Sequence, residues 1–508
     1  MKARMPVPSR PERTLGQSAV HAVLWTASQR WMVRITGFIT IAILTRMLTP
    51  ADFGTVAIVT AILPLMYLIA DLGFSTYIVQ AREADQRMLS TAFWFTSSAG
   101  LLLAGAFVCA APLVDMVFNV DGAGDVMWGL APTVLLVTVT TVPMSLLRRR
   151  MAFRSLAMQS LIASLVGQAI AIVMALSGFG VWALIAQTLV NQLVASVYAW
   201  IVARWRPSLK FDRTEFKAMT TFGSKVVGVE LIATGRLLAE NAIITSALGV
   251  SALGYINIAQ RLVQVAQDVT AAAILPVSTV VFAQVRENPD RLRSIYVRSL
   301  GLTYSAIIPV MILLAATSPI LIPVLFGSQW LESVAPAQIL AVVSIFVMGA
   351  MLDHGLFYGA GQPGRWFVYA TVIDGLTIVT ALFTAPHGLV VWALGFFGVA
   401  IVATVIRWPL VAALLRMGWT EIARVFGRTM GTGAVTALLT VAASYAVSGM
   451  VPILQLVILA AVVVTTHVAA MYLFTRAIFK EGLSHILRLR RPRRPTRAET
   501  PHGEGELR

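Results

Sequence analysis

Apolar runs, each long enough to cross a lipid bilayer, make up most of the chain. A hydrocarbon layer about 30 Å thick needs about 20 helical residues, and breaking the sequence at Pro, Gly and charge clusters leaves fourteen such runs. They are predicted at 20–47, 53–79, 89–113, 126–147, 155–177, 180–203, 220–248, 252–283, 299–325, 335–357, 365–385, 389–415, 426–448 and 452–475. The 508-residue chain is 58% hydrophobic and 12% charged, far from the balance of a soluble domain. The sequence therefore predicts an all-α polytopic membrane protein.

The basic residues lie on one side of these runs. With a cytoplasmic amino terminus, all Lys and Arg residues outside the runs fall in cytoplasmic segments, whereas the opposite loop 114–125 carries Asp115, Asp121 and Asp125. This positive-inside pattern predicts that both termini are cytoplasmic, and it explains the net charge of +16 without nucleic-acid binding. The basic sequence RLRRPRRPTR at 488–497 is expected to be a disordered segment near anionic lipid headgroups.

Four pairs of similar segments recur in the same order about 200 residues apart. The pairs are LTPADFGTVAI at 48–58 with LGVSALGYINI at 248–258, QAREADQR at 80–87 with QVRENPDR at 284–291, Ala131-Pro132 with Ala335-Pro336, and GFGVWAL at 178–184 with GLVVWAL at 388–394. Each match is weak alone, but their common order indicates a duplicated unit of six helices. An even number of helices gives both copies the same orientation, which is a transporter architecture with its substrate site between the lobes.

The repeat divides the chain into two six-helix lobes followed by two more helices. The predicted segments are a cytoplasmic tail at 1–17, an N-lobe at 18–203, a cytoplasmic linker at 204–217, a C-lobe at 218–416, helices 13 and 14 at 417–478, and a basic disordered tail at 479–508. The single cysteine, Cys109, lies within an apolar run. It excludes a disulfide framework, a CxxC redox pair and a cysteine-ligated metal site.

Four segments are the most specific in the chain: LTRMLTPADFG at 44–54, ADLGF at 70–74, LLRRRMAFRSLA at 146–157 and GFGVWAL at 178–184. They resemble bacterial oligosaccharide flippases, and more closely the WzxC-like polysaccharide biosynthesis branch of the multidrug/oligosaccharidyl-lipid/polysaccharide exporter superfamily. The resemblance implies a protein of the bacterial inner membrane that moves an undecaprenyl-pyrophosphate-linked oligosaccharide from the cytoplasmic to the outer leaflet by alternating access. Such a protein serves the synthesis of exopolysaccharide, capsule or O-antigen, and no motif here specifies the sugar.

Polar groups inside the apolar runs are the candidate contacts for such a cargo, because sugars and pyrophosphate enter hydrocarbon only at a large desolvation cost. Arg30 and Arg34 lie one turn apart on one helix face. They are predicted phosphate contacts, since a guanidinium suits bidentate phosphate binding. We expect further groups, on the runs at 220–248 and 252–283, to converge on the same cavity: Arg236, Asn241, Gln260, Arg261 and Gln264.

A structural role is the alternative for several of these residues. Arg236 and Glu240 are spaced to form an ion pair within one helix, and the polar stripe of 252–283 can also pack between helices. Arg46 and Arg407 lie near the ends of their runs and are expected to snorkel toward the interface. For Asp353 and His354, expected near a cytoplasmic helix end, a cap and a gate both remain open.

Enzyme motifs are absent from the sequence. It contains neither a Walker A sequence nor HExxH, and GAGQPG at 359–364 falls between two apolar runs without a preceding strand, so it is read as a turn. We therefore expect a transporter without bound cofactor or metal. An inside-negative potential contributes about 2.3 kcal/mol per charge per 100 mV. H⁺ or Na⁺ coupling is a further hypothesis, with candidate carriers Asp71, Glu230, Glu240 and Asp268.

The flippase is the leading interpretation, with three alternatives. A multidrug or cation antiporter of the related branch usually has twelve helices and fits less well. A lipid II flippase is a nearby variant, and a membrane enzyme or scaffold in a polysaccharide assembly complex is the third alternative. The expected partners are the lipid-linked oligosaccharide, membrane lipids, and a polysaccharide polymerase with its chain-length machinery. A monomer is expected, with no nucleic-acid partner.

Overall fold

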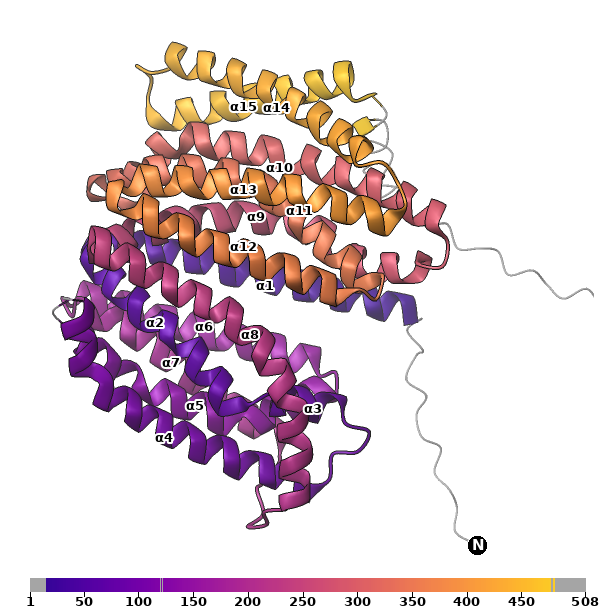
Figure 1. Ribbon diagram of the computed structural model, residues 1–508. Coiled ribbons are helices and arrows are strands. Elements are labelled where there is room, and N and C mark those ends of the chain that lie inside the picture. Colours follow the sequence, from indigo (N-terminus) through magenta and orange to yellow (C-terminus); the bar gives the residue numbers. More distant parts are fainter. Residues whose placement is uncertain (1–14, 119, 121, 477, 480–508) are drawn as a thin grey trace, which may run out of the picture.

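The protein, described from a computed structural model, is built from helices throughout residues 15–118, 120, 122–476 and 478–479, the part of the chain that the structure describes (Figure 1). The elements are α1 (Leu15–Met47), α2 (Pro50–Asp71), α3 (Phe74–Gln80), α4 (Gln86–Phe118), α5 (Ala123–Arg149), α6 (Phe153–Leu176), α7 (Trp182–Ala203), α8 (Arg213–Leu248), α9 (Val250–Val285), α10 (Pro289–Phe326), η1 (Ser328–Ser333), α11 (Val334–Gly359), α12 (Pro363–Thr384), η2 (Ala385–His387), α13 (Leu389–Leu415), α14 (Trp419–Ala446) and α15 (Pro452–Phe474). Most of both predicted tails, 1–14 and 480–508, lies outside the described residues.

Twelve helices within the described residues are long and apolar enough to cross a bilayer. The two long helices outside that set are α1 and α9. They carry Arg34, Arg261 and Asp268, three of the polar residues that the sequence places within apolar runs. The all-α membrane fold is thus confirmed, and the arrangement is compatible with the predicted fourteen spanning helices.

The helices form two lobes with matching internal packing (Figure 1). In the first lobe α4 packs on α5, α6 on α7 and α5 on α7, and in the second α10 packs on α11, α12 on α13 and α11 on α13. Helices α14 and α15 pack on each other and on α10, at the side of the second lobe away from the first (Figure 1). The parallel repeat with two additional helices is therefore confirmed.

The turn between α1 and α2 and the equivalent turn between α8 and α9 are stabilised in different ways. Before α2, Thr49 and Asp52 form a capping box, in which the Asp52 N–H donates to Thr49 Oγ1 at 3.2 Å and the Thr49 N–H donates to Asp52 Oδ2 at 2.8 Å. Before α9, Gly249 takes a φ of +83°, which suits glycine. GAGQPG forms the predicted turn between α11 and α12, with Gly361 at a φ of +74°.

The apolar run predicted as one helix at 53–79 is two helices. Leu72 and Gly73 adopt left-handed backbone conformations, with φ of +44° and +73°, and separate α2 from α3. The Asp71 carboxylate stabilises the start of α3 by accepting hydrogen bonds from the Ser75 N–H at 3.1 Å and hydroxyl at 2.7 Å. The prediction of one continuous helix was wrong because the apolar pattern continues through the break.

A second boundary also differs from the expectation. Helix α8 begins at Arg213, inside the segment predicted as a linker at 204–217. The Asp212 side chain caps this helix by accepting from the N–H groups of Glu215 and Thr214, at 3.2 and 2.8 Å. These hydrogen bonds, that of Glu215 first, hold the pKa of Asp212 below its usual range.

The lobes are in close backbone contact where α2 and α9 begin. A Cβ added to Gly54 of α2 would lie 1.9 Å from the Val250 carbonyl oxygen, and one added to Gly254 of α9 would lie 2.0 Å from the Pro50 carbonyl oxygen. Positions 54 and 254 are equivalent in the repeat, so the contact is reciprocal. Only glycine permits two backbones to approach this closely.

The opposite end of α2 also contacts the second lobe. A Cβ on Gly223 of α8 would lie 1.7 Å from the Leu72 carbonyl oxygen, and one on Gly73 would lie 2.8 Å from the Gly223 Cα. A helix of 22 residues is about 33 Å long, which matches the hydrocarbon thickness. The two lobe contacts therefore lie about one membrane thickness apart.

Trp330 of η1 strengthens the contact at the start of α2. Its side chain is fully buried, its indole N–H donates to the Thr45 carbonyl at 2.9 Å, and its ring packs edge-on to Phe53 at 5.2 Å. Tyr255 of α9 adds a third ring, 6.1 Å from that of Trp330. Residues of α1, α2, α9 and η1 thus form one apolar seal across the two lobes.

Gly54→Ala is expected to loosen this seal, because the backbone of Val250 cannot yield without separating α2 from α9. Overpacking of this kind costs about 1–3 kcal/mol. The probe is a cysteine at position 57 (Ala57→Cys) in a protein that also carries Cys109→Ser. Ala57 lies one turn from Gly54 and is 9% exposed. The measurement is the rate at which a water-soluble thiol reagent labels this cysteine. Labelling should become several-fold faster.

Gly105→Ala on α4 is the matched control for this experiment. Nothing lies within 4 Å of the position its Cβ would take, so the labelling rate at position 57 should stay unchanged. Equal labelling rates in the Gly54→Ala and Gly105→Ala proteins would contradict the assigned seal.

Candidate functional site

Two polar cavities adjoin at α7, where both are lined by Asn191 and Gln192. The larger has a volume of about 680 Å³ and is bounded by α2, α3, α5, α6 and α7 of the first lobe and by α8. The smaller, about 400 Å³, lies between α1, α2 and α7 of the first lobe and α9 of the second. Both cavities therefore have walls from both lobes, as a transporter site requires.

The larger cavity has acidic and neutral polar groups on its wall. Asp71 at the end of α2 and Glu230 on α8 both line it, together with Arg148 of α5. Gln159 of α6 donates to the Ala195 carbonyl at 2.7 Å, which fixes its amide against α7. The charged groups among its lining residues are thus two carboxylates and one arginine, so this cavity lacks the excess of arginine that a pyrophosphate site would favour.

The smaller cavity holds Arg261 and Asn257 of α9. The guanidinium of Arg261 lies beside Gly37 of α1, with Nη2 3.9 Å from the position that a Cβ there would take, so the absent side chain leaves room for it. None of the ion pairs within the described residues involves Arg261. Its positive charge is therefore available to a bound anion.

Arg34 of α1 forms an ion pair with Asp268 of α9, with Nη2 2.8 Å from Oδ2. Gln264 donates to the other oxygen of Asp268 at 3.1 Å, and the Arg34 guanidinium lies 6.0 Å from the centre of the Trp31 ring. Since both charged side chains are about one-third exposed, the pair remains accessible to a ligand. It also links a helix of the first lobe to a helix of the second.

Arg236 forms two ion pairs within the second lobe. Its Nη1 lies 2.8 Å from Glu240 of the same helix, and its Nε lies 3.0 Å from Asp374 of α12. Glu240 is buried. The structural alternative predicted for Arg236 and Glu240 is therefore present, because their charges connect α8 to α12.

The other predicted contacts are dispersed. Asn241 is half-buried and Gln260 is exposed, and neither lines the two cavities. Arg30 lies within α1, but its side chain is outside the described part of the structure. The predicted residues thus do not converge on one cavity, and their roles in binding stay predictions.

Sequence reasoning missed the amides of α7 and α6. Asn191, Gln192 and Gln159 lie within apolar runs and line the larger cavity, but they carry no charge, and charge was the main signal for the predicted contacts. An uncharged amide in an apolar run was the available signal, because such a group needs a polar partner or a water-filled space.

Arg407 does not snorkel. It is fully buried in the second lobe, and its Nε lies 2.5 Å from Asp353 Oδ2. Tyr296 of α10 donates its hydroxyl hydrogen to the other Asp353 oxygen at 2.6 Å. The expectation for Arg407 was wrong because Asp353, inside α11 rather than at its end, provides a buried partner. The pair joins α11 to α13 away from both cavities.

Comparison with known sequences identifies the family. The sequence profile of the polysaccharide biosynthesis protein family matches residues 43–335, which is more than half of the chain. The chain belongs to this family. The predicted resemblance is therefore confirmed, and its relatives by sequence include proteins of three bacterial polysaccharide systems.

Each of these relatives aligns with about two thirds or more of this chain. The succinoglycan biosynthesis transport protein ExoT of Rhizobium meliloti is 28% identical over 361 residues, covering 70% of this chain and 72% of ExoT. The teichuronic acid biosynthesis protein TuaB of Bacillus subtilis is 21% identical and covers 74% of this chain and 79% of its own. The lipopolysaccharide biosynthesis protein WzxC of Escherichia coli is 21% identical, covering 65% and 68%.

Solved structures show the same fold at low identity. The lipid II flippase MurJ in an inward closed conformation matches 90% of this chain and 99% of its own, with a TM-score of 0.73 and 13% identity. An inward-facing multidrug resistance MATE transporter of the MOP superfamily matches 78% of this chain and 99% of its own, with a TM-score of 0.60 and 16% identity. The family member described here thus shares the two-lobed transporter fold.

Arg407→Met is expected to destabilise the protein by about 3–5 kcal/mol, because it leaves the Asp353 carboxylate buried without its counter-ion. The double variant Arg407→Met/Asp353→Asn removes both charges and should recover part of that loss. Thermal unfolding in detergent measures both effects. A double variant no more stable than Arg407→Met would contradict the assigned pairing.

Proposed function

We propose that the protein is a flippase that moves a lipid-linked oligosaccharide across the membrane for surface polysaccharide biosynthesis. Its family and its relative ExoT, a transport protein of succinoglycan biosynthesis, support this function. The observation that carries the proposal is the pair of polar cavities with walls from both lobes, enclosed between close lobe contacts at the two ends of α2. A polar headgroup can occupy such a space without entering hydrocarbon.

The proposed cargo is an oligosaccharide on undecaprenyl pyrophosphate. Arg261 is the proposed pyrophosphate contact, since it lines the smaller cavity and no ion pair in the described part of the chain uses its charge. Arg34 contributes when its pair with Asp268 opens, and Arg30 keeps the role proposed from its position one turn away. The amides of Asn191, Gln192 and Asn257 are proposed to hydrogen-bond sugar hydroxyls.

Transport is proposed to proceed by alternating access in a bacterial inner membrane, with both termini cytoplasmic. The contact of Gly54 with Val250 and that of Gly223 with Leu72 open in turn, so that the cavities face one side of the membrane at a time. The positive-inside distribution of Lys and Arg supports this orientation. An inside-negative potential then favours outward movement of the anionic headgroup.

Coupling to H⁺ or Na⁺ is proposed at Asp71 and Glu230. Both line the larger cavity, and none of the ion pairs among the described residues involves either carboxylate, although Arg148 lines the same cavity. Glu240 and Asp268 are weaker candidates because arginines already pair with them at 2.8 Å.

A strain lacking this protein tests the function. An undecaprenyl-linked oligosaccharide should accumulate on its cytoplasmic face, as measured by mass spectrometry, and the surface polysaccharide should disappear. When the deletion strain expresses Arg261→Gln instead of the wild type, polysaccharide export should be at least about tenfold slower, because a hydrogen bond to a charged group contributes about 1.5–3 kcal/mol.

Arg424→Gln is the control for that experiment, since it removes the same charge from an exposed position of α14 outside both cavities. It should restore export at the wild-type rate. Unchanged lipid-linked sugars and unchanged surface polysaccharide in the deletion strain would argue against the flippase and direct the next test to drug efflux.

Asp71→Asn and Glu230→Gln test ion coupling separately. Transport in vesicles should lose its dependence on the H⁺ or Na⁺ gradient in at least one of them, since the neutral amide cannot exchange a proton or hold a cation. Asp125→Asn, at an exposed position of the α5 start, is the matched control and should keep that dependence. Full gradient dependence in both variants would rule out this site for coupling.

A further inference from the structure

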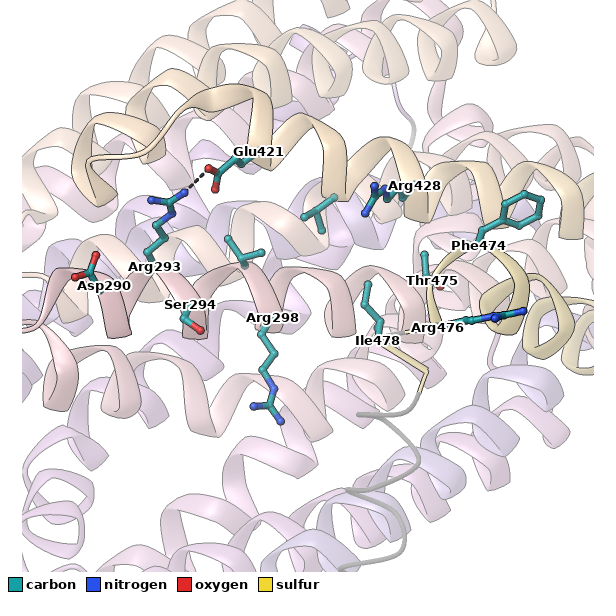
Figure 2. Close-up of a pocket in the computed structure, with 12 residues that line it drawn as sticks. Asp290, Arg293, Ser294, Arg298, Glu421, Arg428, Phe474, Thr475, Arg476 and Ile478 are labelled. Atoms are coloured by element: carbon teal, nitrogen blue, oxygen red, sulfur yellow. Dashed lines mark hydrogen bonds and ion pairs between the residues drawn. The ribbon is translucent and has the colours of Figure 1, made fainter.

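A pocket of about 620 Å³ lies outside the two transport cavities and shares no lining residue with them. Its walls come from the first turns of α10, from α14, and from the end of α15 with the residues that follow it (Figure 2). It therefore sits where the two additional helices meet the second lobe. Nothing in the proposed transport cycle uses this pocket.

The pocket is rich in arginine. Arg293 and Arg298 of α10, Arg428 of α14 and Arg476 after α15 line it, against two acidic residues, Asp290 and Glu421. Arg293 forms an ion pair with Glu421 at one end, and Figure 2 shows Arg428 and Arg476 toward the other. Among the described lining residues, basic side chains outnumber acidic ones, and they come from three separate helical segments.

The guanidinium of Arg476 is held in position by its own segment. Its Nε donates to the Tyr472 carbonyl at 3.1 Å, and its Cζ lies 5.0 Å from the centre of the Tyr472 ring. The hydrogen bond to Tyr472 uses Nε and neither of the two terminal nitrogens. A positioned guanidinium suits the oxygens of a phosphate group, and the hydroxyls of Ser294 and Thr475 add two hydrogen-bonding groups to the lining.

The rest of the lining is apolar. Val297, Val425, Phe474 and Ile478 contribute side chains between the arginines, and Phe474 is 60% exposed on the outer surface of α15. The Ile478 side chain packs directly on Gly301 of α10, with Cδ1 2.8 Å from the position that a Cβ there would take. The pocket thus offers cationic groups and an apolar wall to one ligand.

We propose that this pocket binds the phosphate headgroup of an anionic phospholipid, whose acyl chains extend along the apolar wall beside Phe474. Basic pockets between membrane helices recognise such headgroups. Soluble phosphate offers the same anionic oxygens but nothing to cover the apolar wall, which favours the lipid. The proposed lipid site does not depend on the identity of the transported cargo. Only its assignment to the cytoplasmic leaflet rests on the membrane orientation proposed above. A bound lipid bridges α14 and α15 to α10.

The test uses the full-length protein in detergent supplied with phosphatidylglycerol or phosphatidylethanolamine, with bound lipid counted by native mass spectrometry. The wild type should retain phosphatidylglycerol preferentially. Arg293→Gln/Arg428→Gln/Arg476→Gln should lower its apparent affinity at least tenfold, since each basic residue near a lipid surface contributes a factor on the order of five. Arg87→Gln/Arg154→Gln/Arg213→Gln removes the same charge from exposed positions outside the pocket and should leave retention unchanged.

Glu421→Gln separates lipid binding from a merely structural role. It breaks the ion pair with Arg293 and makes the pocket more positive, so phosphatidylglycerol retention should rise, whereas damage to the fold would lower it. Equal retention by the wild type and the pocket variant, or equal loss in the two triple variants, would overturn the proposal. Inorganic phosphate that displaces phosphatidylglycerol, or stabilises the lipid-free protein through the same arginines, would assign the site to a soluble anion instead.

Discussion

Two glycines that are equivalent in the repeat, Gly54 and Gly254, determine how closely the lobes approach. Each places its backbone against a carbonyl group of the other lobe, at a distance that any side chain would prevent. This contact is made by backbone and apolar groups, and none of the ion pairs among the described residues joins α2 to α9. A contact of this kind can form and separate without leaving a buried charge unpaired.

Charged residues have different roles in the two lobes: in the second lobe they form ion pairs between helices, and at the lobe boundary they line the cavities. The second lobe uses Arg407 with Asp353, and Arg236 with Glu240 and Asp374, to join its own helices. The first lobe and its boundary with α8 and α9 instead present polar groups to the cavities. Arg34 and Asp268 form the exception, because this pair joins helices of different lobes and must change if those lobes move apart.

The repeat and the helical fold were readable from the sequence because each depends on local patterns. Apolar run length predicts spanning helices, and the four pairs of recurring segments predict the repeat. The break at Leu72 and Gly73 was missed because the apolar pattern continues through it, although Gly73 was a local signal for a positive φ. Arg407 was misplaced for a different reason, since its partner lies on another helix. Spacing within one helix was enough only for Arg236 and Glu240.

The most direct test of the central claim is transport by the purified protein in proteoliposomes. A lipid-linked oligosaccharide placed in one leaflet should become accessible to a membrane-impermeant glycosidase on the other side, and a disulfide engineered between the starts of α2 and α9 should stop this movement until it is reduced. Movement of the oligosaccharide that needs neither the protein nor the opening of this contact would contradict a flippase working by alternation of the two lobes.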